Sequence, residues 1–113
     1  MNRTHQEIDA RTLAMHRMIA EKIKRDPSLF EKPSVVIARW RNKVCGSSLP
    51  YLLEWERLIG QGMNACLSVA TEESEYATAL RQSSPFVGIL TEKERLSFLK
   101  SWSGSRAKVS HAP

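Results

Sequence analysis

The chain has 113 residues, a hydrophobic fraction of 42%, a charged fraction of 26% and a formal net charge of +5, a composition that indicates one soluble globular domain. No apolar run approaches the roughly 18 residues that a membrane-spanning helix requires, and the polar residues 1–7 lack the apolar segment of a secretory signal. We therefore expect a cytoplasmic protein. Cys45 and Cys66 stand alone, outside any CxxC pair, and are expected to be buried thiols, without a disulfide, metal or cofactor.

The positive charge is concentrated in the N-terminal part of the chain. Residues 1–43 hold ten Lys or Arg and five Asp or Glu, whereas residues 44–113 hold seven of each. The whole excess of +5 therefore lies in the first part. A localised positive surface attracts nucleic acid or an acidic protein, and the alternative is a solvated face that only keeps the protein soluble.

The first expected helix lies in this basic part. Thr4 and Glu7 have the spacing of a capping box. Ile8, Met15, Ile19 and Ile23 fall on one face of a helix. Pro27 disfavours helix for the residue before it, so the helix should end near Asp26.

A second helix is expected from an N-cap at Ser34 to about Val44, because Val36, Ile37 and Trp40 fall on one helical face. The run 35–37 is also compatible with a strand. The sequence offers no second β-rich run to pair with it, and unpaired strand backbone is costly, so the pattern favours the helix.

A third helix, the longest buried one, is expected from an N-cap at Ser48 to Ala70, with Pro50 in its first turn. Gly60 and Gly62 each cost about 1 kcal/mol inside a helix relative to Ala. The apolar period keeps its phase across both, which favours close approach of another helix over a break at this point.

Two shorter helices are expected to flank a compact loop at residues 81–90. Pro85 stops the preceding helix by Ser83, Gly88 can adopt a positive φ, and Thr91 with Glu94 forms a second capping box. The loop also contains four apolar residues: Phe86, Val87, Ile89 and Leu90. This content favours a plug buried under the helices; the alternative is a recognition segment in which the Phe ring is exposed.

The sequence thus predicts an all-α fold, a small single-domain helical bundle of about five helices over residues 1–102, followed by a disordered basic tail at 103–113. The shared helical period predicts a core that includes Ile19, Ile23, Trp40, Leu52, Trp55, Ile59, Leu80, Phe86, Leu96 and Leu99.

Residues typical of catalysis are scarce. The three His residues are scattered, and the carboxylates lie at helix starts or on polar faces, as expected of capping and solubility groups rather than an acid–base pair. Arg11 and His16 resemble the Arg-x4-His motif of HEPN-type ribonucleases, in which the two side chains act on RNA at a dimer cleft. That ribonuclease is the least favoured hypothesis, and we expect no enzyme.

Arg39, Arg41 and Lys43 flank Trp40 near the end of the second helix, and basic residues interleaved with an aromatic residue are typical of nucleic-acid binding. A DNA-binding regulator using the basic N-terminal helices is therefore one hypothesis. The residues expected to contact a protein partner or nucleic acid are Arg11, Arg17, Arg39, Arg41, Lys43 and Arg81.

From Leu49 to Trp102 the chain resembles a set of small, poorly characterised bacterial proteins. The resemblance rests on Tyr51, Leu52, Glu54 and Trp55, on Ser74 and Glu75, and on Leu80 to Phe86, Gly88, Leu90, Thr91, Glu94 and Arg95. Members of that set are often encoded beside a nucleotidyltransferase-like protein, in an arrangement resembling a toxin–antitoxin pair. The resemblance implies a non-catalytic, antitoxin-like binding module with a nucleotidyltransferase-type partner; nucleic acid and a homodimer stay open as further partners.

Overall fold

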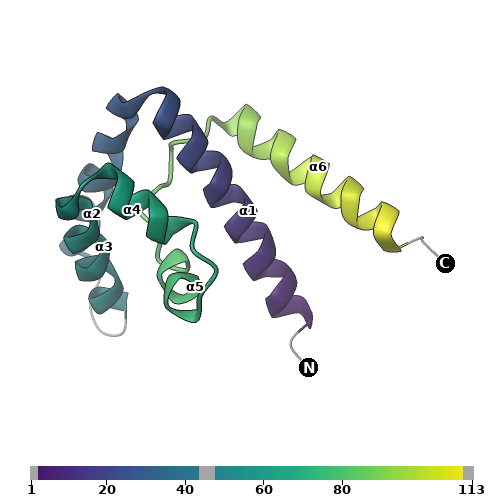
Figure 1. Cartoon of the computed structure of the whole chain (residues 1–113), viewed down its shortest axis with the longest axis horizontal. Helices are drawn as coiled ribbons and strands as arrows, with labels where there is room; N and C mark the ends of the chain where they lie inside the picture. Colours follow the sequence, from purple (N-terminus) through teal and green to yellow (C-terminus); the bar gives the residue numbers. More distant parts are fainter. Residues whose placement is uncertain (1–2, 44–47, 111–113) are drawn as a thin grey trace.

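The computed structural model describes residues 3–43 and 48–110, and the side chains of residues 6–43 and 48–102. The all-α fold class is confirmed, because every regular element in these residues is a helix (Figure 1). The elements are α1 (Arg3–Arg25), the 3-10 helix η1 (Pro27–Glu31), α2 (Lys32–Arg41), α3 (Leu49–Gln61), α4 (Met63–Ala70), α5 (Glu75–Arg81) and α6 (Glu92–Ser110). None of the described helices is both long and apolar enough to cross a membrane.

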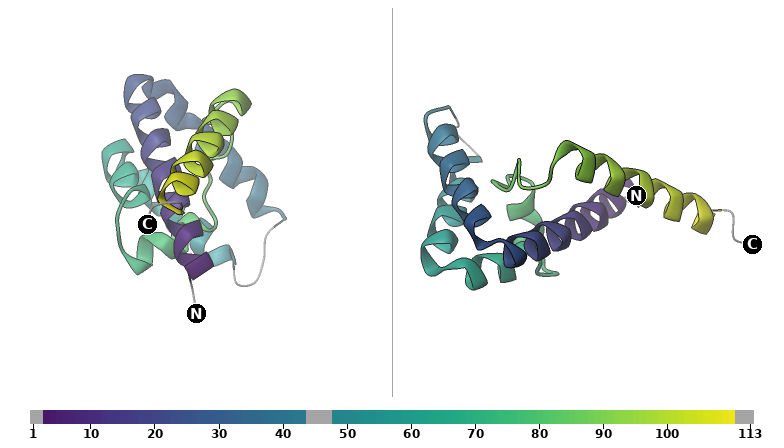
Figure 2. Two further views of the ribbon diagram at one scale, coloured as in Figure 1. Left: turned by 90° about the vertical axis from the view of Figure 1, so that its right-hand side faces the viewer. Right: turned by 90° about the horizontal axis from the view of Figure 1, so that it is seen from above.

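The helices form a body of α1 to α5 from which α6 departs. Helix α1 packs against α4 and α5, and α3 packs against α2, α4 and α5. In Figure 1 these partners lie on one side of α1 and α6 lies on the other. Figure 2 also shows α6 extending away from α2, α3 and α4.

Trp55 of α3 lies at the centre of the core. Its side chain is fully buried, and its indole Nε1–H donates a hydrogen bond of 2.8 Å to the Leu80 carbonyl oxygen. Cys66 of α4 is also fully buried, as expected, and burial raises the pKa of its thiol to about 12, which leaves the group unreactive. The predicted core residues that are buried are Ile19, Ile23, Leu52, Trp55, Leu80 and Phe86.

The other four predicted core residues are less buried. Ile59 packs against the core and is only partly buried, and Trp40 and Leu99 are half-buried. Leu96 is 52% exposed, so its assignment to the core was wrong. Residues 96, 99 and 102 are spaced as on one helical face, but α6 leaves the body, and its Phe98 and Trp102 rings stack on each other at 6.1 Å instead of entering the core.

The glycine interpretation was also wrong. The segment predicted as one helix from 48 to 70 is divided at Gly62, whose backbone has φ of +118° and ψ of 165°, a conformation that is essentially restricted to glycine. A Cβ atom placed on Gly60 or Gly62 would meet no atom within 4 Å. No helix approaches closely there, and the break explains why one helix more than expected is present.

Of the predicted helix starts, the capping box of α6 is confirmed and the N-cap of α2 is wrong. Thr91 and Glu94 form the expected capping box: the Thr91 N–H donates to Glu94 Oε1 at 2.8 Å, and the Glu94 N–H donates to Thr91 Oγ1 at 3.1 Å. Helix α2, however, begins at Lys32 with Pro33 in its first turn, so Ser34 is not its N-cap. A proline at that position is preorganised for a helix start, which moves the boundary ahead of the serine.

Helix α6 continues to Ser110, so the loss of apolar periodicity after Trp102 does not mark its end. A helix with a capped start gains one backbone hydrogen bond per added residue and needs no apolar stripe to continue. Helix α2 ends at Arg41, three residues before the predicted end near Val44. Other expectations fall outside the described parts: the Thr4 hydroxyl of the first capping box, Cys45, and the tail residues 111–113.

Candidate functional site

The loop between α5 and α6 has a buried half and an exposed half. Phe86 is 2% exposed and meets the rings of Trp55 and His16 edge-on, at centroid distances of 5.4 and 6.0 Å. Ile89 is likewise buried. These two residues behave as the predicted plug. Val87 does not, because it is 55% exposed; it forms the crest of the loop beside Gly88, which has the expected positive φ of +84°.

His16 fastens the loop to α1. Its Nδ1–H donates to the Thr12 carbonyl at 2.8 Å, so the neutral ring accepts at Nε2, from the Ser84 hydroxyl at 2.7 Å. Ser84 Oγ in turn accepts the Phe86 N–H at 3.2 Å. Burial lowers the pKa of His16, which keeps the ring neutral. The side chain therefore acts as a packing and fastening group, an arrangement that does not favour the ribonuclease hypothesis for Arg11 and His16.

Lys22 of α1 joins the other end of the loop to α6. Its Nζ donates to the Ile89 carbonyl at 2.8 Å and to Glu94 Oε1 at 2.6 Å. The bond from Lys22, together with the Thr91 backbone, lowers the pKa of Glu94 to about 2. One lysine thus takes part in fixing both the loop and the first turn of α6, a role that its place in a basic helix did not reveal.

The six predicted binding residues do not form one surface. Arg17 pairs with Glu73 at 3.2 Å, and Arg41 pairs with Glu56 at 2.9 Å. The other four, which form no ion pair within the described residues, are the exposed Arg39 and Lys43, the half-buried Arg11, and Arg81. Arg39, Arg41 and Lys43 are neighbours in sequence at the end of α2, but Arg41 pairs with Glu56 of α3 whereas Arg39 borders the loop.

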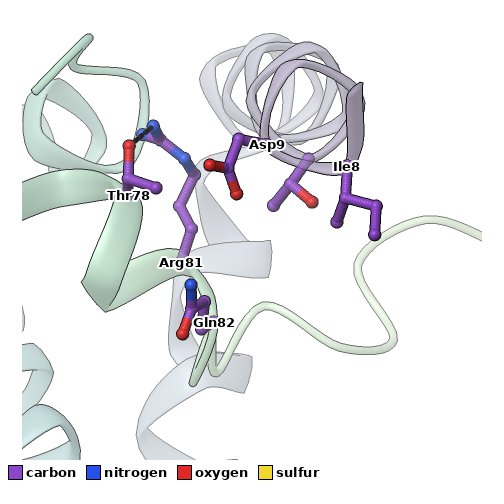
Figure 3. A pocket seen from close by; sticks show the side chains of 6 residues that line it. Ile8, Asp9, Thr78, Arg81 and Gln82 are labelled. Carbon is purple, nitrogen blue, oxygen red and sulfur yellow. Dashed lines mark hydrogen bonds between the residues drawn. The ribbon is translucent and has the colours of Figure 1, made fainter. Parts of the chain in front are cut away.

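Arg81 lies apart from that surface, because its side chain is buried with 5% exposure. Its Nη1 donates to the carbonyls of Ala70 and Glu72, at 3.1 and 2.9 Å, and its Nη2 donates to Thr78 Oγ1 at 3.3 Å. The residue ties the α4–α5 connection together and lines a hollow of about 380 Å³ between α1 and α5 (Figure 3). Arg81 is therefore not part of the surface at the end of α2, and its contact with a partner stays a prediction.

A second hollow, of about 390 Å³, lies between α2 and the loop crest. Its walls include two exposed valines, Val35 at 58% and Val87 at 55% exposure, and the cations Lys32 and Arg39. Lys32 Nζ lies 3.4 Å from the Gly88 carbonyl oxygen, to which it donates. We call these four residues, Lys32, Val35, Arg39 and Val87, the α2–crest face.

The loop crest also borders a third hollow, of about 490 Å³, between the crest, α1 and α6. Met15, Ile19, Phe86 and Leu90 give this hollow a mainly apolar lining, and Arg95 stands among its lining residues. Val87 and Gly88 line both this hollow and the one beside α2. The crest is therefore a ridge between two depressions, which a partner can contact on both sides.

Sequence reasoning singled out the loop and Arg39 but missed Lys32, Val35 and the exposure of Val87. The spacing of positions 32, 35 and 39 places them on one helical face, a signal that was available. In the described parts of the chain no group of three His, Cys, Asp or Glu side chains is placed to hold a metal ion. No family model, no curated protein and no solved structure matches the chain.

Proposed function

We propose that this chain is a non-catalytic binding module that docks an acidic partner protein on the α2–crest face. The observation that carries the proposal is the pairing of two exposed valines with two cations around one hollow. Apolar residues grouped at a concave surface supply binding energy when they are covered. The cations select an acidic partner and speed its approach.

The charge around the face supports this choice of partner. Arg39 and Lys32 border the hollow, and Lys43 follows Arg39 beyond the end of α2. Glu31 is the acid that lines the same hollow. The face is therefore positive overall, which matches the excess of basic residues in the first part of the sequence.

The proposed partner is a nucleotidyltransferase-like protein in the cytoplasm, to which this chain binds as an antitoxin-like subunit. The resemblance of residues 49–102 suggests that partner. The loop that carries much of the resemblance also supplies Val87, so the resembling segment and the α2–crest face meet at one residue. In this role the chain covers an acidic surface of the partner and performs no chemistry.

The test is co-purification with the untagged product of the neighbouring gene, followed by calorimetric titration. Val87→Asp places an anion in the face, and we expect at least a ~30-fold weaker Kd, the result of losing about 2 kcal/mol at a hot spot. Leu53→Asp is the matched control, because Leu53 is exposed to a similar extent, 44%, on α3. Both variants should keep the melting temperature. Equal affinity of Val87→Asp and wild type would contradict the proposal.

A second candidate function is DNA binding by the end of α2, favoured by the absence of an acidic partner for Arg39 and Lys43 among the described side chains. If this is correct, a double change to Glu should weaken DNA binding, and log K should fall with log salt by about 0.9 per phosphate contact. Val87→Asp should weaken protein binding far more than DNA binding, so this variant separates the two functions.

A further inference from the structure

Arg81 carries a buried charge that forms no ion pair with any acid in the described residues. The guanidinium is buried, and its three hydrogen bonds run to two backbone carbonyls and one hydroxyl, all of them uncharged groups. None of the ion pairs in the described residues includes it. A buried charge is normally matched by an opposite charge in contact with it, and at Arg81 that place is open.

The free donors of Arg81 face the α1–α5 hollow. An arginine has five N–H donors. The three bonds use both N–H groups of Nη1 and one of Nη2, so the Nε–H and one Nη2–H remain. Every fully buried side-chain nitrogen in the described residues has a partner. The unpartnered Nε is therefore reached by solvent, and the hollow that Arg81 lines provides that access.

Asp9 of α1 stands on the opposite wall of the same hollow. Figure 3 shows its carboxylate on the side that faces Arg81, with Thr78 and Gln82 on the α5 wall. The two opposite charges interact across the space without forming an ion pair. Arg17, Glu72 and Glu73 also contribute to the field at Arg81. The hollow thus presents a cation on one wall and an anion on the other.

We propose that this hollow binds a free α-amino acid, with the ligand carboxylate on Arg81 and the ligand ammonium on Asp9. An α-amino acid carries both charges close together, so one small molecule can form charge-assisted hydrogen bonds with Arg81 and with Asp9. The hydroxyl of Thr12 and the amide of Gln82 border the same space and can complete the ammonium and carboxylate contacts.

The lining also argues against other small ligands. A phosphate or a simple carboxylate satisfies Arg81 but meets repulsion from Asp9. A nucleobase gains most from an aromatic stacking partner, and there is none among the described lining residues, which are Ile8, Asp9, Thr12, Thr78, Arg81 and Gln82. Ile8, 45% exposed at this hollow, offers an apolar contact for the ligand side chain. This site is separate from the α2–crest face and does not depend on the proposed function.

The experiment titrates the full chain with each of the proteinogenic L-amino acids singly at millimolar concentration, by thermal shift and then by calorimetry. We expect at least one amino acid to raise the melting temperature and give a saturable heat. Its N-acetyl derivative and its amide each lose one charge, and each should bind at least ~10-fold more weakly, as expected for the loss of one charged hydrogen bond.

Asp9→Asn is the decisive variant, because it removes the anionic wall at nearly constant shape and leaves Arg81 in place. Binding should weaken at least ~10-fold. Glu73→Gln is the matched control, since Glu73 is an exposed acid near Arg81 that does not line the hollow, and it should bind as wild type. The proposal is overturned if no amino acid binds, if Asp9→Asn binds equally well, or if acetate alone binds as tightly as the amino acid.

Discussion

Two neighbouring glycines should respond to the same substitution with opposite signs. Gly62 has a φ of +118° and a ψ of 165° at the α3–α4 break, a region in which a residue with a side chain costs of order 1–3 kcal/mol. Gly60 lies in the last turns of α3, without a positive φ, and a methyl group added there would meet no atom within 4 Å. Alanine there gains about 0.5–1 kcal/mol, because it reduces the entropy lost on helix formation.

We therefore expect Gly62→Ala to lower the free energy of unfolding by about 1–3 kcal/mol and Gly60→Ala to raise it by about 0.5–1 kcal/mol. Urea unfolding followed by circular dichroism measures both, and the slope with urea should stay unchanged, since neither variant changes the surface exposed on unfolding. Space limits neither position, so the contrast isolates the backbone conformation. A stabilised Gly62→Ala variant would refute the reasoning, because it would mean that α3 and α4 run on as one helix.

Three further predictions concern the loop and its fasteners. Phe86→Ala should destabilise the fold by ~3–5 kcal/mol through a cavity beside Trp55, whereas an unchanged melting temperature would show that the ring does not act as a plug. Because the pKa of His16 is lowered in the folded chain, the unfolded chain takes up a proton first as the pH falls. The contribution of His16 to stability should therefore be constant above about pH 6.5 and fall below it. His16→Gln should flatten that fall in pH-dependent urea titrations, and an equally steep fall would assign it to other groups. The pKa of Glu94 is about 2, and Lys22 is the main cause of this low value. In a Lys22→Met variant, NMR titration should give a pKa closer to 4.5. In the wild type, the contribution of the Glu94 carboxylate to stability is present above pH 4.5 and is lost as the pH falls towards 2.

Much of the fold could be predicted where the cause is local. Helix α1 ends at Arg25, two residues before Pro27, because a proline restricts the backbone just ahead of it. Thr91 with Glu94 begins α6 through two reciprocal hydrogen bonds. The break at Gly62 could not be predicted from periodicity, because the apolar phase continues across it. Whether a glycine bends the chain or accepts a neighbour depends on what packs there, and the sequence does not state this.

The candidate sites depended on contacts between distant residues and were mostly beyond sequence reasoning. Arg81 reads as one more surface cation until its guanidinium is seen bonded to Ala70 and Glu72. His16 reads as an isolated histidine, although Ser84, 68 positions away, completes its hydrogen bonding. Leu96 follows a correct helical period on a helix that leaves the core. In each case the local sequence pattern does not determine burial or bonding partners, because these depend on residues that are distant in the sequence.

The three tryptophans have different surroundings, so their fluorescence can report on three separate parts of the chain. Trp55 is sealed in the core, Trp40 is half-buried at the end of α2, and Trp102 stacks on Phe98 along α6. Emission from the sealed indole should be the bluest and the least accessible to a soluble quencher, and the other two should lie further to the red. Variants that keep one tryptophan and replace the other two with Phe would then follow the core, the α2 end and the outer helix separately, in the same titration and without any added label.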